Sequence, residues 1–479
     1  MRSTWPQRPG LPAESRALHF IGEDFAPHAR VRAALNARSD IVPPVRSPIP
    51  RWVVAGALCL VAGCATAPPI APTREAPTTA PSEPAPPAAT QSPPTDDHTP
   101  PRMNTIRPEF TQATTTFALD LFRRVAQQDA DKNVFISPAN VAIALAMTAN
   151  GARGETLQAM LATMGNEGAT LDGLNADYAA LQALLRRDDP GLVLTIANSL
   201  WARAGVPFNA DFLQRARRFY AAEISELDFT QPNAPGVING WVSDKTNGKI
   251  PDLVDDIPED AVLFLISAIY FNGAWQTPFN AELTQDLPFN LLDGSQKQTP
   301  TMFRSGTFEY LKGGDFQAVR LPYTGDTLRM VVFLPDAGRT LAEFESMLTS
   351  ENWATWRTQF APQQGELFLP RFKATYNIAL NDVLQAMGMA AAFDPSKADF
   401  SGMRPIPPTI FISSVRHLAY VEVNEAGTEA AAATSVQADT TSAGPIEDRF
   451  TMRVDRPFCF AIEDSSTGSL IFIGAIVEP

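Results

Sequence analysis

The sequence is poor in histidine and cysteine. Its 479 residues contain four His and three Cys, and only His417 and Cys459 lie after residue 105. A disulfide needs two cysteines and a structural zinc site usually four Cys or His ligands, so residues 105–479 lack both sets. The sequence also has no G-x-S-x-G or H-E-x-x-H motif. We therefore expect no disulfide, metal, cofactor or histidine-based catalytic centre, and we expect Cys459 to be an inert core thiol.

Positive charge is also scarce after the N-terminal region. The formal net charge is −14, and residues 1–64 hold eight Arg against four acidic residues, so residues 65–479 carry −18. A surface with this excess of negative charge repels phosphate and sulfate groups. Nucleic acids and heparin-like polyanions are therefore not expected as partners.

The N-terminal region has features of a targeting segment. Residues 1–50 are rich in Arg and Pro without a sustained apolar period, so no fold is assigned to them. Arg51 precedes the apolar run Trp52–Ala62, which is too short for a stable transmembrane helix. The run leads into Ala-Gly-Cys64, so residues 51–64 resemble a bacterial lipoprotein signal peptide. This resemblance implies cleavage before Cys64 and lipidation of its thiol.

A lipoprotein signal predicts a lipid-anchored, extracytoplasmic protein of the cell envelope, in the outer membrane, the periplasm or on the cell surface. Because the signal begins fifty residues into the chain, we hypothesise that translation starts near Val45 and that residues 1–44 are not made. N-terminal sequencing of an unprocessed variant tests this hypothesis. The alternative is a cytoplasmic tail in front of a chance apolar patch.

Residues 65–104 read as a linker. They contain twelve prolines in forty residues, with Ala, Thr and Ser between them. Such a segment buries too little apolar area to offset its ordering entropy, and it favours extended conformations of about 3.1 Å per residue. We expect a disordered spacer between Cys64 and a folded body.

Residues 105–479 mix helical and strand patterns, which indicates an α+β domain. Ser137, followed by a proline and a long charge-free run, predicts the start of a buried helix. Ala261–Phe271 is an apolar run typical of a central strand covered on both faces. Arg456–Ile462 and Leu470–Ile476 predict a C-terminal hairpin.

The stretch Val421–Ser442 has the pattern of a strand in the setting of a loop. Read with a period of two from Thr428, one face is uncharged and small or β-branched, and the other holds both Glu429 and Asp439. A half-buried strand needs this separation. Propensity alone would make Ala430–Ala433 helical. The alternation and the flanking polar residues instead predict an exposed loop that can become a strand.

This stretch resembles the reactive-loop hinge of the serpins. Asn424–Thr434 reads N-E-A-G-T-E-A-A-A-A-T, and the family pattern differs only in an acid at the place of Ala426. Other serpin-like motifs follow one another through the body, including NVFISPANVAIALAM from Asn133, INGWVSDKTNGKI from Ile238 and FNGAWQTPF from Phe271. The resemblance implies an α+β serpin fold with three β-sheets, about eight or nine helices and an exposed reactive loop.

The resemblance also implies roles for individual residues. Trp275 corresponds to the tryptophan under the point where the loop enters the sheet. Asn140 stands where the family has a serine and Ser267 where it has an asparagine, so we expect these two residues to have exchanged partners. The cluster that controls opening of the central sheet is Ser137, Asn140, Ser267 and His417. The hinge is Glu425, Gly427, Thr428, Glu429, Ala430, Ala431, Ala432, Ala433 and Thr434.

As a function, the resemblance implies a serine protease inhibitor that acts as a suicide substrate, and not an enzyme. The family spacing from Glu425 places the cleaved bond at Thr441–Ser442, which predicts a target with a small-residue pocket, elastase- or subtilisin-like. We expect a monomer that meets the membrane only through its lipid anchor. Two alternatives are a non-inhibitory serpin that acts as a binding or chaperone-like lipoprotein, and a surface lipoprotein enzyme that depends on His417.

Overall fold

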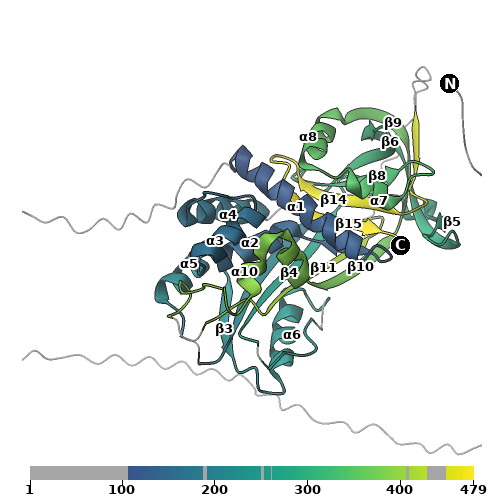
Figure 1. Ribbon diagram of the computed structural model, residues 1–479. Coiled ribbons are helices and arrows are strands. Elements are labelled where there is room, and N and C mark those ends of the chain that lie inside the picture. The colour runs from purple at the N-terminus through teal and green to yellow at the C-terminus, as the bar shows by residue number, and fades with distance from the viewer. Residues whose placement is uncertain are drawn as a thin grey trace, which may run out of the picture. The chain divides into compact units, whose positions relative to one another are not determined.

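The computed structural model describes residues 106–186, 191–205, 207–249, 253–259, 261–405, 409–428 and 449–479 (Figure 1). All of them fall within one structural unit. The predictions for residues 1–50, for the signal 51–64 and for the linker 65–104 lie outside the described residues.

Helices and strands alternate along this unit, and the six helices α1 to α6 all precede β4. Three short helical pieces from Asn381 to Phe393 follow one another without a break and form a single kinked segment, with φ of +120° at Gly388. None of the described helices is long and apolar enough to cross a membrane. The helices are α1 Pro108–Gln128, α2 Pro138–Ala149, α3 Gly154–Thr163, α4 Leu171–Leu185, α5 Ala210–Tyr220, α6 Ala234–Lys245, α7 Leu341–Ser346, α8 Ser350–Gln359, α9 Asn381–Leu384 and α10 Ala390–Phe393, with η1 Ala281–Leu283 and η2 Gln385–Met389.

The strands form two hydrogen-bonded sheets among the described residues. One has six strands in the order β10-β11-β12-β4-β2-β3, and the other has nine, β1-β15-β14-β8-β7-β6-β9-β13 with β5 beside β6. The strands are β1 Val134–Ile136, β2 Leu192–Arg203, β3 Glu223–Leu227, β4 Leu263–Ala274, β5 Gln285–Asn290, β6 Gln296–Lys312, β7 Phe316–Pro322, β8 Leu328–Pro335, β9 Ala361–Pro370, β10 Phe372–Ala379, β11 Ser414–Val423, β12 Gly427–Thr428, β13 Phe450–Arg453, β14 Phe458–Asp464 and β15 Leu470–Ile476.

The expected α+β architecture is present, and one long strand explains why the described residues form two hydrogen-bonded sheets where three were expected. β6 pairs with β5 at its start, with β9 along its middle and with β7 at its end. A strand of this length belongs to both halves of the nine-stranded sheet, so hydrogen bonding does not separate them.

The predicted central strand is β4, and its alternation explains why it is apolar throughout. Leu265, Ile269 and Phe271 face the main core, whereas Phe264 and Ile266 face a second cluster under α6. α2 packs against the same strand from the core side. Because both faces are covered, burial selects apolar residues at almost every position.

Two further predictions from the sequence are confirmed. Ser137 is the N-cap of α2: its side chain accepts a hydrogen bond from the backbone N–H of Asn140, and every residue of the helix is buried. β14 and β15 form the C-terminal antiparallel hairpin. Cys459 lies in β14 as a buried free thiol, and burial raises its pKa, which keeps it protonated and unreactive.

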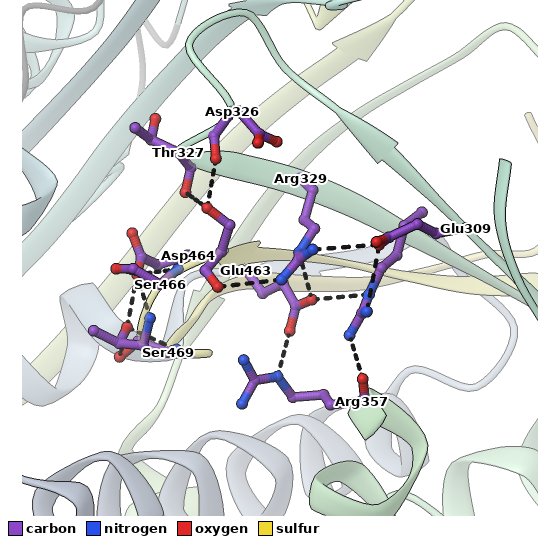
Figure 2. A network of polar contacts seen from close by, with 12 residues as sticks. Glu309, Asp326, Thr327, Arg329, Arg357, Glu463, Asp464, Ser466 and Ser469 are labelled. Carbon is purple, nitrogen blue, oxygen red and sulfur yellow. Dashed lines mark hydrogen bonds and ion pairs between the residues drawn. The ribbon is translucent and has the colours of Figure 1, made fainter. Parts of the chain in front are cut away.

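A buried ionic cluster around Glu463 ties β14 to its neighbours (Figure 2). The fully buried carboxylate of Glu463 has the Nε atoms of Arg320, Arg329 and Arg357 at 3.2, 3.0 and 3.1 Å. Only the contact from Arg357 is aligned as a hydrogen bond. Glu309 contacts Arg320 and Arg329 from the exposed side. The cluster joins β7, β8, β14 and the end of α8, which no single stretch of sequence contains.

Candidate functional site

The site lies where β11 and β4 separate. Over most of their length these strands pair directly and in parallel, from Ser414 opposite Phe264 to Tyr420 opposite Tyr270. Beyond this last pair the two-residue strand β12 lies between them and is antiparallel to both. We call the directly paired stretch, which ends at Tyr420 and Tyr270, the closed part of the sheet. Beyond it, the start of the predicted loop already separates β11 from β4.

Thr428 occupies the opening and points into the core. It lies opposite Val423 of β11 and Gly273 of β4, and it is fully buried. Its hydroxyl is 2.7 Å from the hydroxyl of Tyr323, which follows β7. Burial raises the pKa of the Tyr323 hydroxyl, so both groups are neutral and each can donate to the other.

The ring of Tyr323 is held rigidly by aromatic neighbours. Trp275 stacks on it with ring centroids 4.7 Å apart, and Phe271 meets it edge-on at 5.0 Å. The backbones of Trp275 and Tyr323 also pair as an isolated β-bridge. This arrangement fixes the position of the hydroxyl that meets Thr428.

Gly427 is required by both conformation and space. Its φ is +153°, which L-residues with side chains rarely adopt. A Cβ at this position would lie 2.1 Å from the carbonyl oxygen of Gly273, a backbone atom that cannot swing aside. Only glycine lets the hinge approach β4 this closely.

Trp275 and the residues after it hold the turn that leads to β12. The Trp275 indole N–H donates to the carbonyl of Asn424 and its backbone N–H to the carbonyl of Ala426, both at 2.9 Å. The backbone N–H of Phe279 donates to the carbonyl of Glu425 at 2.9 Å. The backbone carbonyls of three consecutive residues, Asn424 to Ala426, are thus bound, so the path of the chain here is held through backbone atoms.

Glu425 anchors the turn through its side chain. Arg371 contacts its carboxylate through Nη2 at 2.6 Å and Nε at 2.8 Å, and the hydroxyl of Thr284 donates to the same carboxylate. Partial burial acts to raise the pKa of Glu425, but the hydrogen bonds from Arg371 and Thr284 outweigh it, so the pKa is lowered. The carboxylate is therefore charged at neutral pH.

A second group of predicted residues meets further down the closed part of the sheet. The Nε2 atom of His417 accepts the backbone N–H of Ser137 at 2.9 Å, and its Nδ1 is 3.2 Å from the hydroxyl of Ser267. The Ser137 hydroxyl donates to the carbonyl of Ile471 at 2.7 Å. The ring of His417 thus joins β11, β4 and the start of α2, and it has no access to solvent.

Comparison with known proteins agrees with this geometry. The family described as Serpin (serine protease inhibitor) matches residues 112–479. Human Serpin B8 is 35% identical over 382 residues, which cover 78% of this chain and all of that protein. Human leukocyte elastase inhibitor is 34% identical over 386 residues, with the same two coverages. The chain belongs to the serpin family. A solved serpin, the thermophilic tengpin in its native state, superposes with a TM-score of 0.73 at 32% identity, covering 78% of this chain and 96% of tengpin.

This serpin departs from the sequence-based expectation at Asn140. The side-chain amide of Asn140 donates to the carbonyl of Ala268 at 3.0 Å, and the Oδ1 of Asn140 accepts a hydrogen bond from the amide of Asn198 at 2.8 Å. Ser267, the expected partner of Asn140, contacts His417 instead. Asn198 of β2 lies directly opposite Ser267 of β4, and it is Asn198 that contacts the Asn140 side chain.

Three residues that the structure places at these sites were not predicted from the sequence as site residues. They are Tyr323, Arg371 and Asn198, each more than fifty residues from the partner that it contacts. Asn198 and Arg371 lie in the serpin-like segments Ala197–Trp201 and Leu369–Phe372, but neither segment indicates the distant partner that the residue contacts. The predicted residues Cys64, Glu429–Thr434, Thr441 and Ser442 lie outside the described residues.

Proposed function

We propose that this serpin inhibits a serine protease as a suicide substrate and traps the acyl-enzyme by inserting its cleaved loop between β11 and β4. The observation that carries this proposal is β12. An uncut loop that already contributes Gly427 and Thr428 to the gap between two parallel strands supports a path by which the rest of the loop can follow.

The chemistry belongs to the protease. Its serine attacks the carbonyl of Thr441, the nitrogen of Ser442 leaves with a proton, and the loop is held to the protease through an ester. Residues 428–441 are then free at their far end. At about 3.3 Å per residue, fourteen residues form a strand of roughly 45 Å.

Insertion supplies the driving force and the displacement. Hydrogen bonds worth about 1 kcal/mol each would sum to the order of 10 kcal/mol over the inserted strand. The attached protease is carried along, and a displacement of catalytic groups by about 1 Å can lower a rate about a hundredfold. Hydrolysis of the ester therefore stalls.

The proposed target has a small-residue specificity pocket, because the assigned bond follows Thr441 and no basic residue lies between Glu425 and Asp448. Leukocyte elastase inhibitor, one of the relatives, bears the name of an elastase. We further propose that the protein is anchored at Cys64 in the cell envelope and acts as a monomer.

Incubation of residues 105–479 with subtilisin and elastase tests the proposed function. A covalent adduct that survives denaturation supports inhibition, whereas cleavage without an adduct indicates a non-inhibitory serpin. The cleaved protein should also resist heat better than the intact protein, because insertion adds strand pairs. Equal heat resistance would contradict insertion.

The variant Thr428→Arg tests the path of insertion. A guanidinium at this position would have to enter the fully buried space beside Tyr323 and would lose its hydration there. We expect Thr428→Arg to be cleaved as a substrate without forming the adduct. Inhibition equal to that of the wild type would exclude entry of the loop at this point.

A further inference from the structure

The contact between Tyr323 and Thr428 exists in the uncut protein. Both side chains are fully buried, their hydroxyls are 2.7 Å apart, and they come from distant parts of the chain, one directly after β7 and one from β12. The Tyr323 ring is held by Trp275 and Phe271, so its hydroxyl is presented at a fixed point. That point is the end of the gap at which the loop enters the sheet.

The register defines how far the gap is already open. Thr428 lies opposite Val423 and Gly273, and Tyr420 lies opposite Tyr270 in the closed part of the sheet. Continued in the same antiparallel register, residues 429 and 430 would fill the gap, and residue 431 would be the first to separate Tyr420 from Tyr270. Thr428 therefore faces a position of β11, Val423, that lies only three residues beyond Tyr420, the last residue of β11 that pairs directly with β4.

We propose that Tyr323 is a positioning residue for loop insertion: its hydroxyl holds Thr428 docked in the resting protein, so that insertion extends an existing strand and does not have to begin one. This inference rests on the proposed function. Beginning a strand requires fixing backbone dihedrals before the following hydrogen bonds form, which is an entropic barrier. When Thr428 is docked, the backbone at the start of the inserted strand is already fixed before the protease cleaves the loop. Trapping then competes better with hydrolysis of the ester.

Two single variants and their combination isolate the hydroxyl contact. Tyr323→Phe keeps the ring stacked on Trp275 and leaves the Thr428 hydroxyl without this partner, and Thr428→Val does the converse with a side chain of the same shape. A buried hydroxyl without a partner is unfavourable, whereas two matching apolar groups are not. We expect each single variant to undock the hinge and the double variant to restore docking.

The first measurement is amide hydrogen exchange at Gly427 and Thr428. Loss of the contact should accelerate exchange about tenfold in each single variant, as expected for one hydrogen bond, and the double variant should return close to the wild-type rate. The second measurement is the number of inhibitor molecules consumed per subtilisin molecule trapped. It should rise severalfold in both single variants and fall again in the double variant.

Tyr220→Phe is the matched control, because it also removes a buried tyrosine hydroxyl, one that donates to Asn175 at 2.7 Å in α4. It should change unfolding but not the consumption ratio. Equal ratios in wild type and all Tyr323 and Thr428 variants would overturn the role of Tyr323 while leaving inhibition intact. A wild-type protein that forms no adduct would instead overturn the proposed function, and this inference with it.

Discussion

The imidazole of His417 bridges β11 and β4 by placing Nδ1 3.1 Å from the carbonyl oxygen of Ser267. On its other side Nε2 faces the backbone N–H of Ser137, which can only donate. Nε2 must therefore be unprotonated, and the neutral ring carries its proton on Nδ1 and donates it to Ser267. A second proton on Nε2 would bring two donors, the Nε2–H of His417 and the backbone N–H of Ser137, face to face in a buried site.

This geometry predicts a pH dependence of stability. Burial lowers the pKa of His417 to about 4, from 6.5, although the hydrogen bond to Ser267 opposes this. Between these values the unfolded chain binds a proton that the folded chain does not, so the free energy of unfolding should fall as pH falls from 6.5 to 4. The loss attributable to His417 is on the order of 3 kcal/mol. Urea unfolding across this range measures it.

The titration of Glu345 in α7 changes the free energy of unfolding in the opposite direction. Glu345 therefore has to be replaced before the contribution of His417 can be measured. Burial raises its pKa to about 7, from 4.5, so its contribution to stability falls as pH rises through that range. We expect Glu345→Gln to show a clear loss of stability on acidification from pH 6.5, and His417→Gln to show a loss on alkalinisation from pH 4.5. Parallel pH profiles in these two variants would contradict the assignment.

Replacement of Gly427 should destabilise the docked hinge. In Gly427→Ala the new Cβ would collide with the carbonyl of Gly273 and the backbone would be strained, so we expect a loss of about 1–3 kcal/mol in the free energy of unfolding. Gly240→Ala is the control, because a Cβ there, within α6, meets open space. The control should be neutral or slightly stabilising. Equal effects of the two substitutions would show that the hinge is not docked as described.

The ion pair of Glu425 and Arg371 should contribute modestly to stability. Arg371 is 44% exposed and Glu425 12%, so a coupling of about 1 kcal/mol is expected from a double-mutant cycle with Glu425→Gln and Arg371→Gln. High salt should reduce it. Because the pKa of Glu425 is lowered, this contribution is present above about pH 4.5 and is lost on acidification below it. A coupling of zero at low salt would mean that the backbone bonds alone hold the turn.

Loss of Glu463 should be the most damaging of these changes. Glu463→Gln keeps the shape of the side chain and leaves Arg320, Arg329 and Arg357 without their buried countercharge, so we expect a loss of about 3–5 kcal/mol in urea unfolding. Glu309→Gln, in the same cluster but 46% exposed, should lose less than about 1 kcal/mol. Similar losses in both variants would contradict a role for burial.

Local patterns predicted much of this fold. Ser137 as an N-cap, the buried strand β4 and the hairpin β14–β15 each follow from residues within a few positions of one another. The alternation that starts at Thr428 likewise marks a loop suited to a sheet, and the structure places its first residue between β11 and β4. The inserted form of that loop remains a prediction.

The partners of these residues were decided by the tertiary structure alone. Thr428 and Tyr323 are 105 positions apart, and Glu463 and Arg357 are 106 apart. The side chain of Asn140 contacts Asn198, whereas the sequence had suggested Ser267 as its partner. Periodicity and capping act over one or two turns of chain, so they specify which face of a strand or helix is buried. Which distant side chain a buried polar group meets depends on how the sheets and helices stack, and nothing in the spacing of residues along the chain encodes that directly.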